Sequence, residues 1–180
     1  MGIQHQARGA PIQEIVGASG PHPAYADKLM LFGRFVGSWD VQHRSILADG
    51  TDRKSRGEWH FYWVLEGRAV LDVVIAPPIP ERDPSVWKLG DYQMALRFYQ
   101  PETDTWDMTA ITPVHNQVRR LVVRTEGDRI VIEGRAPDGT HTRWSFNDIT
   151  PNRWRWQGEV SADEGKTWVT DEEMILTRRS

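Results

Sequence analysis

The sequence predicts an all-β fold: a single closed, antiparallel, up-and-down barrel of about ten strands with a short N-terminal helix. Three observations predict it. From about residue 38 onward, apolar and polar residues alternate with the period of two that is typical of half-buried strands. The 15 glycines and 11 prolines lie mostly between these runs, where turns are expected. No segment repeats along the chain, whereas a propeller would repeat about every 40–50 residues.

The N-terminal part of the chain differs from the rest. Residues 1–23 are rich in Gly, Pro, Gln and Ser and show little periodicity, so we expect a loose arm there. One barrel domain should then occupy residues 24–180. The run AYADKLMLFGRF, residues 24–35, predicts one short helix that ends before Gly37. Its apolar residues fall at near-helical spacing: Leu29, Met30, Phe32 and Phe35.

Ten alternating runs follow the helix, each near the usual length of a strand and joined to the next by a short turn. They are residues 38–47, 57–67, 68–77, 91–100, 106–112, 118–126, 129–135, 141–149, 153–160 and 168–177. The Gly-Asp pair at 127–128 is a strong local signal for a hairpin. Closing the strands into a barrel removes the exposed edges that an open sheet of this size would leave.

Composition excludes several classes of function. With 22 basic and 25 acidic residues the formal net charge is −3, which indicates no nucleic-acid partner. In NRWRWQ, residues 152–157, arginine and tryptophan alternate and would lie on opposite faces of a strand, unlike an RNA-binding platform. The absence of cysteine excludes disulfides and thiolate sites. No apolar run reaches ~20 residues and no signal-peptide core is present, so we expect a cytoplasmic protein without a membrane partner.

The stretch SADEGKTW, Ser161–Trp168, matches the Asp-box pattern Ser-x-Asp-x-Gly-x-Thr-Trp that is best known from propeller glycosidases. It occurs once, in a chain without repeats. We therefore interpret it as a turn and not as a sign of sugar cleavage. Ser161 and Asp163 would accept backbone N–H groups, Gly165 would supply an unusual backbone conformation, and Trp168 would anchor the returning strand.

The stretch FVGSWDV contains Gly37-Ser38-Trp39, which resembles the Gly-x-Trp signature of lipocalins and related calycin barrels. The resemblance covers roughly residues 30–179 and includes bacterial lipocalin-like families of unassigned function. It implies that an arginine of the last strand, Arg178 or Arg179, stacks on Trp39. Nitrobindin-type barrels, which are related, hold haem through a histidine near the C-terminus. No histidine follows His141 here, so haem is not expected.

A barrel of ten strands encloses more space than its own side chains fill, so a ligand cavity is expected. Neither face of the strand at residues 68–77 is plainly polar, so Asp72 can point inward and be buried. A buried carboxylate needs a partner, and the candidates are Arg97 and, with less functional interest, Arg68. The pair is either a structural ion pair in the barrel wall or an acid/base couple. We name Asp72, Arg97 and His60 as candidate catalytic residues.

Candidate ligand-binding residues are the aromatic side chains and histidines of strands and loops that would line the cavity. They are Trp63, Tyr99, Trp106, His115 and His43. No histidine pair has metal-ligand spacing, so no metal site is expected. Neither a Gly-x-Ser-x-Gly elbow nor a phosphate-binding loop is present.

These patterns leave three functions open. The first is binding of a small apolar or aromatic organic molecule in the cavity. The alternative is a cofactor-independent enzyme of the cyclase, isomerase or lyase type that uses the same cavity. The third is an interaction module, which would have a filled interior. No cofactor is expected, and a homodimer is compatible with the sequence.

Overall fold

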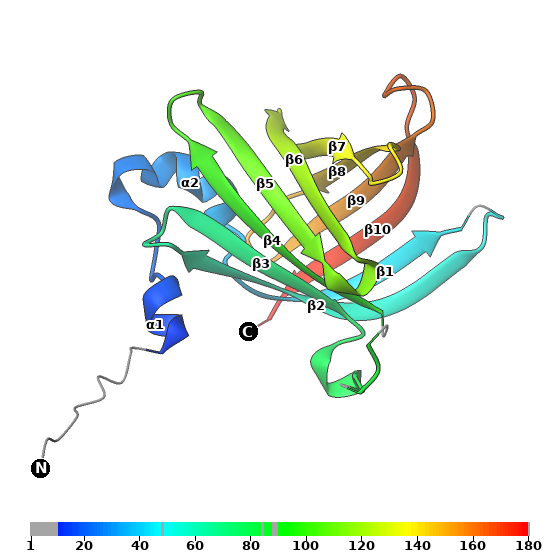
Figure 1. The fold of residues 1–180 in the computed structure, drawn as a ribbon, viewed down its shortest axis with the longest axis horizontal. Helices are drawn as coiled ribbons and strands as arrows, with labels where there is room; N and C mark the ends of the chain where they lie inside the picture. The colour runs from blue at the N-terminus through cyan, green and yellow to red at the C-terminus, as the bar shows by residue number, and fades with distance from the viewer. Residues whose placement is uncertain (1–10, 48, 84, 88–89, 180) are drawn as a thin grey trace, which may run out of the picture.

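The computed structural model describes residues 11–47, 49–83, 85–87 and 90–179. Its ten strands form one closed antiparallel barrel, as the sequence predicts (Figure 1). The strands are β1 (Gly37–Ile46), β2 (Asp52–Val64), β3 (Ala69–Ala76), β4 (Asp91–Gln100), β5 (Thr105–Thr112), β6 (Gln117–Glu126), β7 (Arg129–Arg135), β8 (His141–Asn147), β9 (Arg153–Ser161) and β10 (Val169–Arg178). Each strand pairs with its neighbour in sequence, and β1 pairs with β10 to close the barrel.

In the described part of the chain, two α-helices precede the barrel. The described part of the N-terminal segment contains helix α1 (Ile12–Val16), and the chain after it follows the turn between β2 and β3. Gly17 forms an isolated bridge with Val64 there. Helix α2 (Ala26–Gly33), the predicted helix, lies across one end of the barrel (Figure 1). Short 3-10 turns cover Pro23–Tyr25, Ile79–Glu81 and Pro113–His115. Within the described ranges, no helix has the length and apolarity that a membrane crossing requires.

The predicted seal between Trp39 and the last strand is present at this end. The Arg178 guanidinium lies 4.2 Å from the centroid of the fully buried Trp39 ring, so Arg178 and not Arg179 is the stacking arginine. The indole N–H of Trp39 donates to the carbonyl of Phe35 at 2.7 Å. Arg178 also donates, at 2.8–2.9 Å, to the carbonyls of Arg34, Val36 and Pro151. One side chain therefore ties α2, β1 and the turn before β9 together.

The Asp-box is a turn, as predicted, and joins β9 to β10. The Ser161 hydroxyl accepts the N–H groups of Asp163 at 3.3 Å and Gly165 at 2.9 Å. The Asp163 carboxylate accepts the backbone N–H of Thr167 at 2.8 Å, which helps to lower the pKa of Asp163 to about 2. Gly165 has a φ of 84°, a conformation that glycine adopts without strain. Trp168 lies under the Arg143 guanidinium at 4.2 Å.

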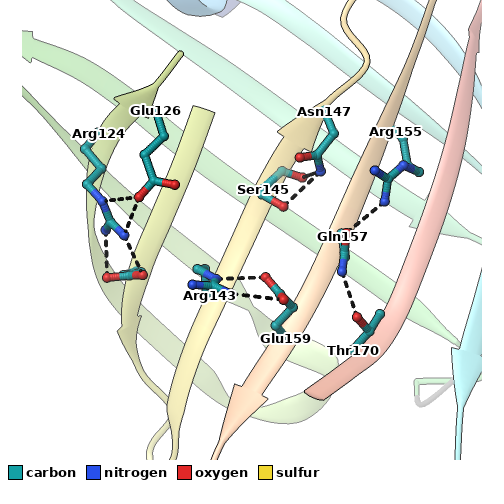
Figure 2. A network of polar contacts seen from close by, with 10 residues as sticks. Arg124, Glu126, Arg143, Ser145, Asn147, Arg155, Gln157, Glu159 and Thr170 are labelled. Carbon is teal, nitrogen blue, oxygen red and sulfur yellow. Dashed lines mark hydrogen bonds and ion pairs between the residues drawn. The ribbon is translucent and has the colours of Figure 1, made fainter. Parts of the chain in front are cut away.

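Polar side chains cover the outer face of β8, β9 and β10 (Figure 2). Arg143 donates twice to Glu159 on the neighbouring strand, at 2.8 and 3.0 Å. Gln157 links Arg155 to Thr170, with 2.7 Å in each hydrogen bond (Figure 2). Because side chains alternate between the faces of a strand, the even-numbered residues of β8 and β9 point into the barrel.

The interior has two unlike halves. The half next to α2 is filled by buried aromatic side chains that contact one another: Phe32, Phe35, Trp39, Phe61, Phe146 and Trp154. In the other half several inward positions carry small side chains, including Thr112, Thr142 and Gly158. The filled half, which we call the closed half, is therefore core. The half with small side chains, which we call the open half, leaves room for a cavity.

Candidate functional site

A cavity of about 420 Å³ occupies the half of the barrel that lies away from α2. This volume falls within the range of about 300–1,000 Å³ that small-molecule sites occupy. Its deeper walls are apolar and aromatic: Val41, Trp59, Val74, Trp144, Trp156 and Met174. Polar and ionisable residues lie nearer the mouth. The site therefore combines an apolar floor with a polar rim.

Three tryptophans form a continuous aromatic arc along the cavity. The rings of Trp144 and Trp156 have centroids 5.9 Å apart, and those of Trp156 and Trp59 are 6.5 Å apart. The indole N–H of Trp59 donates to Asp72 at 2.6 Å, which fixes the ring. Gly158 allows the arc to close, because a Cβ there would lie 2.9 Å from the Trp156 ring and 3.2 Å from the Asp171 carboxylate.

Two successive carboxylates of β10 line the same cavity. The pairing of β10 with β9 shifts register between Thr170 and Glu172, which marks a β-bulge. Asp171 and Glu172 therefore both line the cavity, although neighbours on a regular strand would point to opposite faces. Burial raises the pKa of Asp171. Burial, reinforced by the charges of Asp171 and Asp91, raises the pKa of Glu172 to about 7.

Arg119 on β6 supplies a cation to the cavity. Its guanidinium lies 5.5 Å from the centroid of the Trp144 ring and donates to Gln117 at 2.9 Å. Among the described residues, no carboxylate forms an ion pair with it within 4.0 Å. Burial lowers the pKa of Arg119, while the charges of Glu172, Asp138 and Asp171 act in the opposite direction. An arginine stays charged at neutral pH, so it can meet a negative charge on a bound molecule.

Two of the predicted ligand-binding residues line the cavity. His43 on β1 lies on its wall, with Nδ1 3.0 Å from the hydroxyl of Ser55. Burial lowers the pKa of His43, which favours the neutral ring. His115 lies at the mouth, where Nε2 is 2.8 Å from the Asp91 carboxylate and both side chains are about half exposed.

The other three predicted ligand-binding residues do not line the cavity, because α2 occupies their end of the barrel. Trp106 packs edge-on against Phe32 of the helix, with centroids 5.1 Å apart. Trp63 lies against Gly33, where an added Cβ would clash with the indole. Tyr99 stands beside α2 and donates its hydroxyl to Asp104 at 2.6 Å. These aromatic residues belong to the closed half.

Asp72 and Arg97 form an ion pair, and their side chains are 0% and 1% exposed. They face each other from β3 and β4 in the closed half and do not line the cavity. The Arg97 guanidinium also lies near three aromatic rings, at 5.0 Å from Phe32 and at 5.7 Å from Phe61 and Phe146. Burial lowers its pKa but leaves it charged at neutral pH. The geometry favours the structural ion pair over the acid/base couple. Asp72 is linked to the cavity by its hydrogen bond with Trp59, which lines it.

His60 does not meet this pair. It lies on the outer face of β2, because its neighbours Trp59 and Phe61 point inward. Nδ1 of His60 is 2.9 Å from the hydroxyl of Ser38, and Nε2 is 3.1 Å from the carboxylate of Glu58. The structure therefore does not bring His60 together with Asp72 and Arg97, the other two candidate catalytic residues.

Arg119, Asp171 and Glu172, the charged residues on which the chemistry of the cavity depends, were not among the predicted ones. The sequence held a signal for two of them, since alternation from Leu176 and Met174 places Glu172 inward, and alternation from Leu121 places Arg119 inward. The position of Asp171 could not be found in this way, because the bulge is not visible in the pattern of polar and apolar residues. Within the described residues, no group of three or more His, Asp or Glu could hold a metal ion.

No protein-family model and no curated protein matches the chain. Solved structures do. The S-type phycobiliprotein lyase CPES from Guillardia theta superposes with a TM-score of 0.52 at 12% identity, over 84% of this chain and 92% of that one. Rv2717c from M. tuberculosis gives a TM-score of 0.55 at 13% identity, over 89% and 99%. Similarity at this level establishes the fold, a lipocalin-like (calycin) barrel of ten strands.

Proposed function

We propose that the chain binds a small apolar or aromatic organic molecule in the cavity of its open half. The observation that supports this most strongly is the arc of Trp59, Trp144 and Trp156 beside about 420 Å³ of space. Indole rings at these separations offer faces and edges to a flat ligand at little entropic cost. An interaction module with a filled interior is a poorer fit, because the open half is not filled.

The ligand should carry a polar group at one edge of its apolar body. Arg119 offers N–H donors on one wall, and Glu172 offers a donor when protonated and an acceptor when ionised. Polar groups of this kind fix the orientation of a ligand that apolar contacts hold. One structural neighbour is named a phycobiliprotein lyase, so a barrel of this shape is compatible with an activity as well as with binding.

Filling the cavity tests the proposal. Thr142 is 5% exposed and faces the cavity from β8, so Thr142→Trp should occupy the space that a ligand needs. A screen of aromatic compounds by quenching of tryptophan fluorescence should find ligands of the wild-type protein whose affinity falls at least about tenfold in the variant, a loss of about 1.4 kcal/mol. Thr177→Trp adds the same ring on the exposed outer face of β10 and should leave affinity unchanged. Equal affinity in both variants would place the ligand elsewhere.

A further inference from the structure

Glu172 and Arg119 stand on opposite walls of the cavity. Their strands, β10 and β6, are separated by three strands in one direction around the barrel and by five in the other. The tryptophan arc follows the shorter way through β8 and β9 and continues to Trp59 on β2. A flat molecule that lies against the arc therefore shares the cavity with a carboxylate on one wall and a guanidinium on another.

We propose that Glu172 is a general base that removes a proton from a carbon atom of the bound molecule, and that Arg119 stabilises the negative charge that results. This inference rests on the proposed binding function. For a carbonyl compound the C–H bond breaks, the proton passes to the Glu172 carboxylate, and the electron pair moves onto the carbonyl oxygen beside Arg119. Return of the proton to a second carbon completes an isomerisation that needs no other reactant.

The surroundings of Glu172 suit this role. Desolvation and the nearby carboxylates of Asp171 and Asp91 raise the pKa of Glu172 to about 7, and Arg119 and His115 only partly offset them. Three further ionisable groups line the same cavity, His43, Asp138 and Glu159, and Glu159 is paired with Arg143. A base with a pKa near neutrality is both ionised and strong enough to accept a proton at physiological pH.

The neighbouring glutamate shows that this environment is specific to one position. Glu173 points to the outer face, where it pairs with Arg44 at 3.2 Å and with Arg155 at 3.5 Å. It has the same chemistry as Glu172 and the adjacent position on the strand, but it lies outside the cavity. Glu173→Gln is therefore a matched control for Glu172→Gln.

A nitro-substituted benzisoxazole is a suitable probe, because it is flat, aromatic and opened by a base alone. The base takes the ring C–H proton, the N–O bond breaks, a nitrile forms, and the electron pair stays on oxygen as a coloured cyanonitrophenolate. Tryptophan quenching reports binding of the probe, and absorbance of the product reports turnover. The two measurements separate the proposed function from this inference.

We expect turnover by the wild-type protein, with a rate that rises as pH increases through about 7 because the ionised carboxylate is the base. Glu172→Gln should bind the probe within a few-fold of wild type and lose about 10²–10⁴-fold in rate. Arg119→Met should lose about 10²–10³-fold, and Glu173→Gln should keep the wild-type rate. Quenching without turnover, or equal turnover in Glu172→Gln, would overturn the inference and leave the binding function standing. Absence of quenching would contradict both.

Discussion

The carboxyl group of Glu172 combines a cost in stability with the catalytic role that we propose for it. Its pKa rises from 4.5 to about 7 because burial disfavours the charged form. An energetic cost of this kind is characteristic of functional sites, where a group is held in an environment that the fold alone would not select. On the outer face the polar side chain of Gln157 carries no such cost, because it forms hydrogen bonds with Arg155 and Thr170.

The cost of burying the ionised Glu172 carboxylate predicts that the free energy of unfolding depends on pH. At low pH the carboxyl is protonated in both the folded and the unfolded chain, and as pH rises from about 4.5 to about 7 the unfolded chain ionises first. Stability therefore falls across this window, by at most about 3 kcal/mol at about 1.4 kcal/mol per pKa unit. Glu172→Gln should raise the free energy of unfolding by about 2–3 kcal/mol near pH 8 and by little near pH 4. Urea titrations at both pH values measure it, and an equal effect at both would contradict the shifted pKa.

Residue-level prediction from the sequence succeeded where a local rule applied. Trp39 and a stacking arginine at position 178 or 179 were expected from a short signature, and Asp72 was paired with Arg97 because a buried carboxylate needs a cation. The function of that pair could not be inferred, because the sequence does not show which half of the barrel is filled. Asp171 was not identified, because the bulge in β10 lets two successive residues point to the same face of the strand, and the sequence pattern does not reveal it.

Among the elements, the strands were the easiest to predict, since ten alternating runs correspond to ten strands. The Asp-box turn was also predictable, because its hydrogen bonds lie within a few residues of one another. Helix α2 was predicted as a helix, but the side chains that it places inside the barrel were not predicted. Phe32 enters the barrel and packs on Trp106 and Phe146, and this contact decides which aromatic residues are core.

The cross-strand pair of β3 and β4 gives a prediction at this scale. Asp72→Asn removes the partner of a fully buried guanidinium and weakens the acceptor of Trp59, so we expect a loss of about 3–5 kcal/mol in the free energy of unfolding. Asp40→Asn is the matched control, since the Asp40 side chain is 63% exposed where it pairs with Arg179, and such pairs contribute at most about 1 kcal/mol. Denaturant unfolding compares the two. Similar losses in both variants would contradict the structural role of Asp72.

At the scale of the whole molecule, the barrel divides one closed interior into a core and a site. Closure of the sheet gives every strand two neighbours, and α2 with the Trp39–Arg178 seal stabilises one end. The other end can then carry small side chains and the ionisable residues that line the cavity. The closed barrel followed from the strand pattern. The position of its cavity depends on contacts between distant segments, which no local pattern contains.

The most direct test is a crystal structure of the protein with the compound that quenches its tryptophan fluorescence most strongly. The account predicts electron density for the compound in the open half, against Trp59, Trp144 and Trp156, with its polar edge toward Arg119 or Glu172. A compound found on the outer surface, with the space between these tryptophans unoccupied, would contradict it.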